Sequence, residues 1–232
     1  MRRVWITRTQ PQADATAARV RAKGWEPVVA PVLTVRPVTD AAVDLTGIEA
    51  LAFTSAAGVR AFAELSPERR RLVFTVGEAT AATARQADFT TVISADGDVD
   101  DLAWLIADAE IDGVVLHPAA AKPAGDLAAD LADSGVTVRT LAVYETVPAE
   151  LPAGILDGLD EIDAVLIHSP SAATRLAEIL ADRRAPDLAV YGISPAALAP
   201  LAGAAIGRRI AAALPNEDAL ISLLAETPAA HA

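Results

Sequence analysis

The chain has 232 residues, no cysteine and a formal net charge of −12 at pH 7. This length can bury one large core or two modest ones. The acidic balance without any basic run excludes a nucleic-acid partner, and the missing cysteines exclude disulfides, thiolate metal sites and a cysteine nucleophile. No apolar stretch approaches the roughly 20 residues that span a bilayer and no signal sequence is apparent, so we expect a cytoplasmic protein without a membrane partner.

Short β-branched segments alternate with longer segments of helical period. The expected elements, in chain order, are strand 4–7, helix 12–23, strand 28–29, strand 50–54, a helix ending at 65, strand 72–76, a helix ending near 87, strand 91–94 and helix 100–108. Such alternation is typical of parallel strands connected by helices. The sequence therefore predicts an α/β fold.

The second half of the chain repeats the first. A predicted helix that ends at Gly24 corresponds to one that ends at Gly135, 111 residues later. Likewise Ser55, which follows a strand and begins a helix, corresponds to Ser169, 114 residues later. A repeat of this length is of domain size. We expect two similar, flavodoxin-like domains with parallel sheets.

Two extended segments bounded by proline, 30–37 and 141–148, lie at matching places in the two repeats. They indicate that the chain crosses to a second domain and later returns. The expected parts are a discontinuous domain of residues 1–33 plus 148–232, a second domain of residues 38–143, and a two-stranded linker of residues 34–37 and 144–147. A ligand cleft is expected between the two domains.

Ser, Thr or Gly stands at four equivalent turns between a strand and a helix: Thr54-Ser55, Gly77, Ser169 and Gly192. Ligands of open α/β sheets bind outside the strand ends, where helix N-termini attract anions. Each hydroxyl alone is more readily explained as an ordinary helix N-cap. Four equivalent turns together favour a binding site.

The usual catalytic motifs are missing, and no pair of histidines has metal-binding spacing. His117 and His168 each end a predicted strand, so a proton-transfer role for His168 stays open beside a purely structural one. His231 lies in a tail that we expect to be frayed. The acidic run 96–101 lacks the glycine and glutamate of a calcium loop and predicts a helix N-terminus. We expect no metal and no organic cofactor.

Tyr144 lies in the second crossing segment, where the first repeat has Leu33. A phenol is protonated at neutral pH and can donate to a leaving hydroxyl. The alternative is a tyrosine that only packs between the domains.

Six short motifs keep a fixed order along the chain: Ile6-Thr7-Arg8, Pro27-Val28-Val29-Ala30-Pro31, Phe53-Thr54-Ser55, Val76-Gly77-Glu78-Ala79-Thr80-Ala81, Val143-Tyr144-Glu145-Thr146 and Ser169-Pro170-Ser171-Ala172. Together they resemble the uroporphyrinogen-III synthase family over nearly the whole chain.

The resemblance implies a cofactor-independent lyase of tetrapyrrole and heme biosynthesis. Its reaction converts hydroxymethylbilane to uroporphyrinogen III and water, with inversion of the terminal pyrrole through a spiro intermediate. Carried over to this sequence, the family pattern makes Tyr144 the residue that assists loss of the hydroxyl. The substrate-binding residues expected on this basis are Thr80, Ser55, Ser169, Gly77, Gly192, Ile193, Ser194 and Arg8. We expect a monomer.

Two departures from the family pattern are visible. The segment 117–121 stands where an Arg-Gly type of turn is common, and Pro195 stands where a threonine is common. The main alternative is a non-catalytic ligand-binding or regulatory module of the same fold. A response-regulator-like pair ranks last, because it needs an acidic pocket at the first strand end, where Thr7-Arg8-Thr9 stands.

Overall fold

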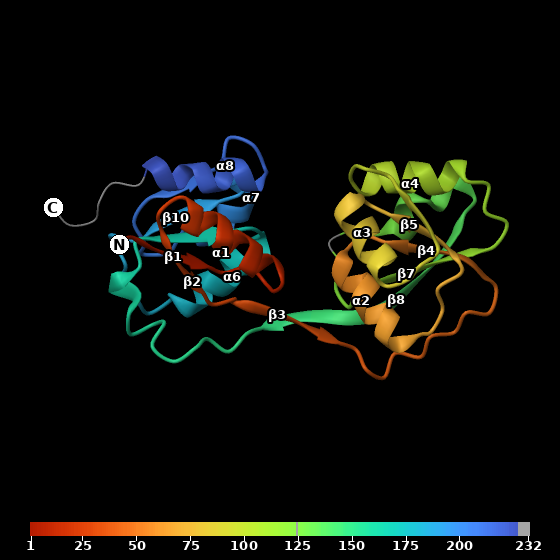
Figure 1. Ribbon diagram of the computed structural model, residues 1–232, viewed down its shortest axis with the longest axis horizontal. Coiled ribbons are helices and arrows are strands. Elements are labelled where there is room, and N and C mark those ends of the chain that lie inside the picture. Colours follow the sequence, from red (N-terminus) through yellow and green to blue (C-terminus); the bar gives the residue numbers. More distant parts are fainter. Residues whose placement is uncertain (124, 227–232) are drawn as a thin grey trace. The chain divides into compact units, whose positions relative to one another are not determined.

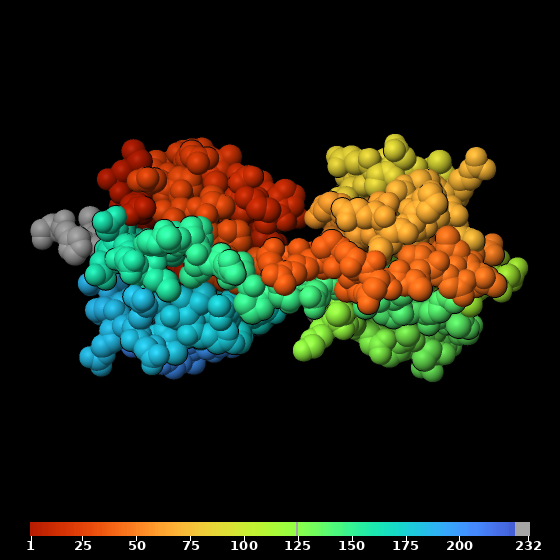
Figure 2. Space-filling view, turned by 90° about the horizontal axis from the view of Figure 1, so that it is seen from below, coloured from red at the N-terminus to blue at the C-terminus, as the bar shows by residue number. Residues whose placement is uncertain are grey.

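The computed structural model describes residues 1–123 and 125–226. Contacts divide the chain into two compact units: unit 1 comprises Met1–Thr34 and Val147–Ala232, and unit 2 comprises Val35–Thr146. In Figure 2 the red N-terminal residues and the blue C-terminal segment belong to one body, which is unit 1. Both crossing points lie within the segments that the sequence predicts as linkers. That the units are independent domains with the predicted limits stays a prediction.

Unit 1 contains a five-stranded sheet in which every neighbouring pair is parallel. The strand order is β11-β10-β9-β1-β2. The strands are β1 (Arg3–Ile6), β2 (Glu26–Val29), β9 (Ala164–Ile167), β10 (Ala189–Gly192) and β11 (Arg209–Ala211). The helices are α1 (Gln12–Ala22), α6 (Pro170–Ile179), α7 (Pro195–Leu198) and α8 (Glu217–Ser222), with 3-10 turns at Leu159–Glu161, Ala199–Leu201 and Leu223–Glu226.

Alternate residues of each strand point to opposite faces, so both faces of this sheet carry a core. In β1, Trp5 faces one core and Val4 and Ile6 face the other, and all three are fully buried. Helices α6 and α7 pack on the face of Trp5, whereas α1 and α8 pack on the opposite face. This burial on both faces explains why the strands read as continuous apolar runs.

Unit 2 holds the second sheet, with the order β3-β8-β7-β4-β5-β6. Strands β3, β4, β5, β7 and β8 are labelled in Figure 1. Its strands are β3 (Leu33–Pro37), β4 (Ile48–Phe53), β5 (Leu72–Thr75), β6 (Thr91–Ser94), β7 (Val114–Ala120) and β8 (Thr137–Pro148). Its helices are α2 (Ala56–Leu65), α3 (Glu78–Gln86), α4 (Val99–Asp108) and α5 (Leu127–Asp130), with a 3-10 turn at Ala132–Ser134. Helices α2 and α3 pack on one face, and α4 and α5 pack on the other.

Strands β3 and β8 carry the chain between the units. The backbone N–H of Ala149 donates to the carbonyl of Val32, and the N–H of Val38 donates to the carbonyl of Val143. The two segments therefore run antiparallel. The four strand pairs among β4 to β8 are parallel. The expected α/β fold with two mostly parallel sheets is confirmed.

The repeat is visible in the strand order. When β4, β5, β6, β7 and β8 are matched to β9, β10, β11, β1 and β2, the two sheets have the same order. Counted along the chain, unit 1 has the flavodoxin-like order 2-1-3-4-5, whereas unit 2 begins at the strand matched to β9. Gly24 and Gly135 end equivalent helices, each with φ of 79°, a conformation that favours glycine.

One strand is longer than the sequence predicts. We expect a strand end at His117, but β7 continues to Ala120. Strand β4 pairs with β7 only as far as Leu116, so at Pro118 the strand has β8 as its single partner. A proline is tolerated there because one side of the strand needs no N–H donor.

Candidate functional site

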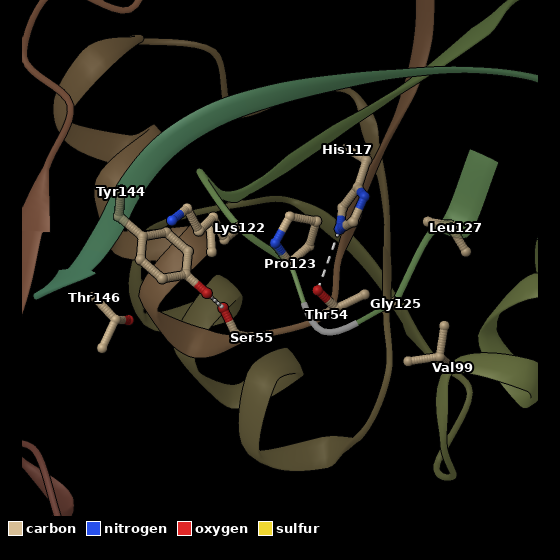
Figure 3. Close-up of a pocket in the computed structure, with 11 residues that line it drawn as sticks. Thr54, Ser55, Val99, His117, Lys122, Pro123, Gly125, Leu127, Tyr144 and Thr146 are labelled. Carbon is tan, nitrogen blue, oxygen red and sulfur yellow. Dashed lines mark hydrogen bonds between the residues drawn. The ribbon is translucent and has the colours of Figure 1, made fainter. Parts of the chain in front are cut away.

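The candidate site lies at the carboxyl ends of β4 and β7 in unit 2. Connections leave these two strands towards opposite edges of the sheet, and open α/β sheets bind ligands at such a switch point. A cavity of about 330 Å³ opens there. Its polar lining consists of six residues, all of which are labelled in Figure 3: Thr54, Ser55, His117, Lys122, Tyr144 and Thr146.

Ser55 and Tyr144 meet in this pocket, with 2.9 Å between the Ser55 Oγ and the Tyr144 hydroxyl (Figure 3). Ser55 is the N-cap of α2, and its Oγ accepts the N–H of Gly58 at 3.1 Å. A Cβ at Gly58 would lie 2.7 Å from the carbonyl oxygen of Pro118, so glycine permits α2 to begin close against β7. Both residues were predicted, but their contact across 89 residues was not.

Thr54, the preceding residue, forms the second polar pair of the pocket. Its Oγ1 lies 3.2 Å from Nε2 of His117, whose side chain is almost completely buried. Burial lowers the pKa of His117, although the charge of Asp126 acts in the opposite direction. The imidazole is therefore neutral at neutral pH. From the sequence, Thr54 belongs to one of the four turns expected to bind a ligand, whereas His117 is recognisable only as the end of a strand.

The pocket has one charged residue among the described residues that line it. This residue is Lys122, which is exposed, in the segment after β7. Val99, Leu127 and Pro123 supply apolar contacts. The combination of an ammonium group, several hydroxyls and an apolar wall can hold a carboxylate-bearing ring and donate a proton to it.

Thr80 and Gly77, also predicted as substrate-binding, lie at the end of β5. Gly77 precedes α3 in an extended conformation, and Thr80 is buried in the first turn of that helix. Neither is among the described residues that line the cavity of Ser55 and Tyr144. The lining of this cavity thus includes two of the four predicted residues of unit 2 and not the other two.

The other predicted residues belong to unit 1. Ser169 and Ser194 are the N-caps of α6 and α7, and each accepts a backbone N–H at 3.2 Å. Gly192 ends β10, and the N–H of Ile193 donates to the carbonyl of Ile167. Both serines therefore have the ordinary capping role, and contact with a substrate stays a prediction.

Arg8 is engaged in an ion pair at the matching switch point of unit 1. Its Nη1 lies 2.8 Å from Oε2 of Glu217, which also contacts His168 Nε2 at 2.9 Å, while Thr16 donates to Oε1 at 2.6 Å. Burial by itself raises the pKa of Glu217, but the hydrogen bonds of His168 and Thr16 and the charges of His168 and Arg8 lower it to about 2. Glu217 is therefore a carboxylate whose charge compensates that of Arg8.

Glu217 could not be recognised from the sequence, because an acidic residue in a first helical turn is common and carries no specific signal. The acidic run 96–101 has the predicted role: Asp98 caps α4, with Asp101 completing a capping box. Within residues 1–123 and 125–226, no three acidic or histidine side chains are placed to hold a metal, and none of the helices is long and apolar enough to cross a membrane. His231 lies outside the described residues.

Comparison with known proteins identifies the family. A family model described as uroporphyrinogen-III synthase HemD matches residues 14–228. A search of curated proteins gives no match.

Solved structures show the same fold. The uroporphyrinogen-III synthetase of Helicobacter pylori 26695 is similar with a TM-score of 0.69 and 17% identity, over 98% of this chain and 100% of that one. A mutant uroporphyrinogen III synthase from the extremely thermophilic bacterium Thermus thermophilus gives a TM-score of 0.55 and 18% identity, over 98% of each chain. At such identities structural likeness establishes the fold alone, so the family model carries the assignment. Its match confirms the family predicted from the short motifs, and the chain belongs to the uroporphyrinogen-III synthase family.

Proposed function

We propose that the Ser55–Tyr144 pair of unit 2 is the site at which the chain cyclises hydroxymethylbilane to uroporphyrinogen III. Family membership makes the chain a cyclising lyase of tetrapyrrole and heme biosynthesis. The observation that supports the site is the 2.9 Å hydrogen bond between the two hydroxyls in a cavity at the switch point of the sheet. A phenol held in this way is a suitable proton donor to a leaving hydroxyl.

The proposed reaction begins at the terminal hydroxymethyl group of the substrate. Tyr144 donates its proton to the hydroxyl, the C–O bond breaks and water leaves, while the pyrrole nitrogen supplies the electron pair that stabilises the cation. The cationic methylene carbon then bonds to the carbon of the last pyrrole that already carries the bridge to its neighbour, which gives the spiro intermediate. That bridge bond breaks, and the released methylene carbon bonds to the free α-carbon of the last pyrrole, so that this ring is inverted and the macrocycle is closed. A ring carbon then releases a proton, which returns to the phenolate. Ser55 keeps the phenol in position, because its own oxygen is fixed by Gly58.

The pocket size limits how much of the substrate it receives. A volume of about 330 Å³ is at the lower end of small-molecule sites, which span about 300 to 1,000 Å³. In the proposal one pyrrole ring enters, with its carboxylates near Lys122 and Thr146, and the other rings lie outside. Contacts with those rings are proposed for the remaining predicted residues, which are Thr80, Gly77, Arg8, Ser169, Gly192, Ile193 and Ser194.

The proposal includes a monomeric enzyme located in the cytoplasm that needs neither a metal nor an organic cofactor. A tetrapyrrole as the substrate class follows from the family. No feature of the described residues favours the alternative of a non-catalytic binding or regulatory module.

The test replaces Tyr144 by Phe, which retains the ring and removes the donor. General acid catalysis typically contributes about 10² to 10⁴ in rate, so we expect kcat to fall by about that factor with little change in thermal stability. The product, analysed as type I and type III porphyrin, should remain mainly type III, because pocket geometry selects the face of attack. Tyr191→Phe, at the only other tyrosine, is the matched control and should retain the wild-type rate. A wild-type rate in Tyr144→Phe would remove Tyr144 from the mechanism.

A further inference from the structure

The pocket of unit 2 contains a second polar pair that the proposed reaction does not use. Thr54 and Ser55 are consecutive, and both side chains line the pocket. Ser55 contacts Tyr144, whereas Thr54 Oγ1 contacts Nε2 of His117 at 3.2 Å (Figure 3). We infer that His117 is a positioning residue, which holds the Thr54 hydroxyl so that it donates into the pocket. This inference rests on the function proposed above for the same pocket.

Burial makes His117 a rigid support for Thr54. The histidine is 2% exposed and comes from β7, while Thr54 follows the neighbouring strand β4 and is half-buried. A β-branched side chain has few χ1 rotamers, and one hydrogen bond is enough to select among them. Without the imidazole, the Thr54 hydroxyl is free to turn away from the pocket.

The tautomer of His117 determines which way the Thr54 proton points. A neutral imidazole has a single N–H. Its Nδ1 is buried and has no partner among the described residues. A buried N–H without a partner is rarer in proteins than an unpaired acceptor, so the proton belongs on Nε2. Nε2–H then donates to Thr54 Oγ1, and the hydroxyl proton of Thr54 is left to donate to a ligand.

The ligand chemistry that fits this donor is a carboxylate of the substrate. Burial keeps the pKa of His117 low despite Asp126, so the imidazole adds no charge, and Lys122 is the cation among the described lining residues. A directed hydroxyl beside an ammonium group fixes where one carboxylate is held, and with it the ring that Tyr144 protonates. Because this contact forms on binding, its loss should act on KM more than on kcat.

The first experiment is a double-mutant cycle on the full chain, with hydroxymethylbilane as substrate. Thr54→Val and His117→Phe should each raise KM about tenfold, the typical effect of one lost hydrogen bond to a charged group. The double variant should be no worse than Thr54→Val alone, because His117 acts only through Thr54. Additive effects, with KM raised about a hundredfold in the double variant, would show that His117 does not act through Thr54.

A conservative variant separates positioning from packing. His117→Gln keeps an N–H donor near the place of Nε2. Its KM should therefore lie much closer to the wild-type value than the raised KM of His117→Phe. Equal KM values for the Gln and Phe variants would overturn the inference.

The wild-type protein offers a measurement that needs no activity. Nitrogen-15 NMR of the imidazole should show His117 neutral at pH 7 with its proton on Nε2, and a proton on Nδ1 would overturn the inference. Failure here is distinguishable from failure of the proposed function. A wild-type rate in Tyr144→Phe removes the proposed catalytic pair, whereas an additive cycle or the wrong tautomer removes only the role of His117.

Discussion

The two units have the same switch point, but its polar groups are paired with a carboxylate in unit 1 and line a pocket in unit 2. In unit 1, between β1 and β9, Glu217 at the start of α8 contacts Arg8, Thr16 and His168. In unit 2, between β7 and β4, the residue at the start of the matched helix α4 is Val99, which lines an open pocket. In unit 1 the carboxylate of Glu217 thus occupies the polar groups of the switch point and stabilises the fold. A valine leaves those of unit 2 available to a ligand.

The largest effect on stability is expected when the carboxylate of Glu217 is removed. Glu217→Ala removes the carboxylate that Arg8 and His168 share, and we expect it to lower the free energy of unfolding by about 3 kcal/mol. Tryptophan fluorescence follows this change, because Trp5 is fully buried in unit 1.

The control for this variant is Glu178→Ala. Its carboxylate is 56% exposed in a pair with Arg175, so the cost should stay below about 0.5 kcal/mol. Equal stabilities of the two variants would show that the Glu217 cluster is not stabilising.

The same cluster predicts a dependence on pH. The pKa of Glu217 is lowered from 4.5 to about 2, so its stabilisation is complete above about pH 4.5 and is lost as the pH falls towards 2. Wild type should exceed Glu217→Gln by on the order of 3 kcal/mol at pH 5, and the difference should shrink to nearly zero near pH 2. Urea unfolding at several pH values measures it. A difference that widens on acidification would contradict the assignment.

A substitution in the other direction should make unit 2 resemble unit 1. Val99→Glu places a carboxylate in the pocket of Thr54 and His117, where it occupies space and repels the substrate's carboxylates. We expect KM to rise at least about tenfold, or about 1.4 kcal/mol. An acid in the first turn suits the helix dipole, so the fold should persist. Trp104→Glu, on the same helix at a side chain 70% exposed, should leave KM unchanged. A similar KM for both variants would contradict the proposal that the substrate binds in this pocket.

The smallest expected effect concerns the equivalent caps Ser55 and Ser169. Each Ser→Ala substitution should cost about 1 kcal/mol of stability, because each hydroxyl accepts one backbone N–H. Ser55→Ala should in addition lower kcat, since Tyr144 loses its partner. Ser169→Ala should raise KM, because it removes the proposed contact with the substrate. Full activity in both destabilised variants would leave them as caps only.

Much of the fold could be predicted from the sequence, because periodicity and the matched glycines Gly24 and Gly135 mark elements and repeat locally. Thr54 and Ser55 were recognisable as residues after a strand. Their pairing with His117 and Tyr144 could not be predicted, although Tyr144 itself stands out in the second crossing segment, because strands buried on both faces carry no alternation that fixes register between distant segments. Glu217 was missed for a related reason, since its partners come from two strand ends and a helix.

The insertion of unit 2 into unit 1 has a consequence for the order of synthesis. On the ribosome, β1 emerges before unit 2, yet its neighbour β9 begins only at Ala164, after all of unit 2. Until then one edge of β1, with the apolar Val4, Trp5 and Ile6, has no strand to pair with, whereas β4 to β8 follow each other without interruption. Unpaired apolar edges associate with other chains. A stalled nascent chain therefore exposes β1, and not the strands β4 to β8, to aggregation.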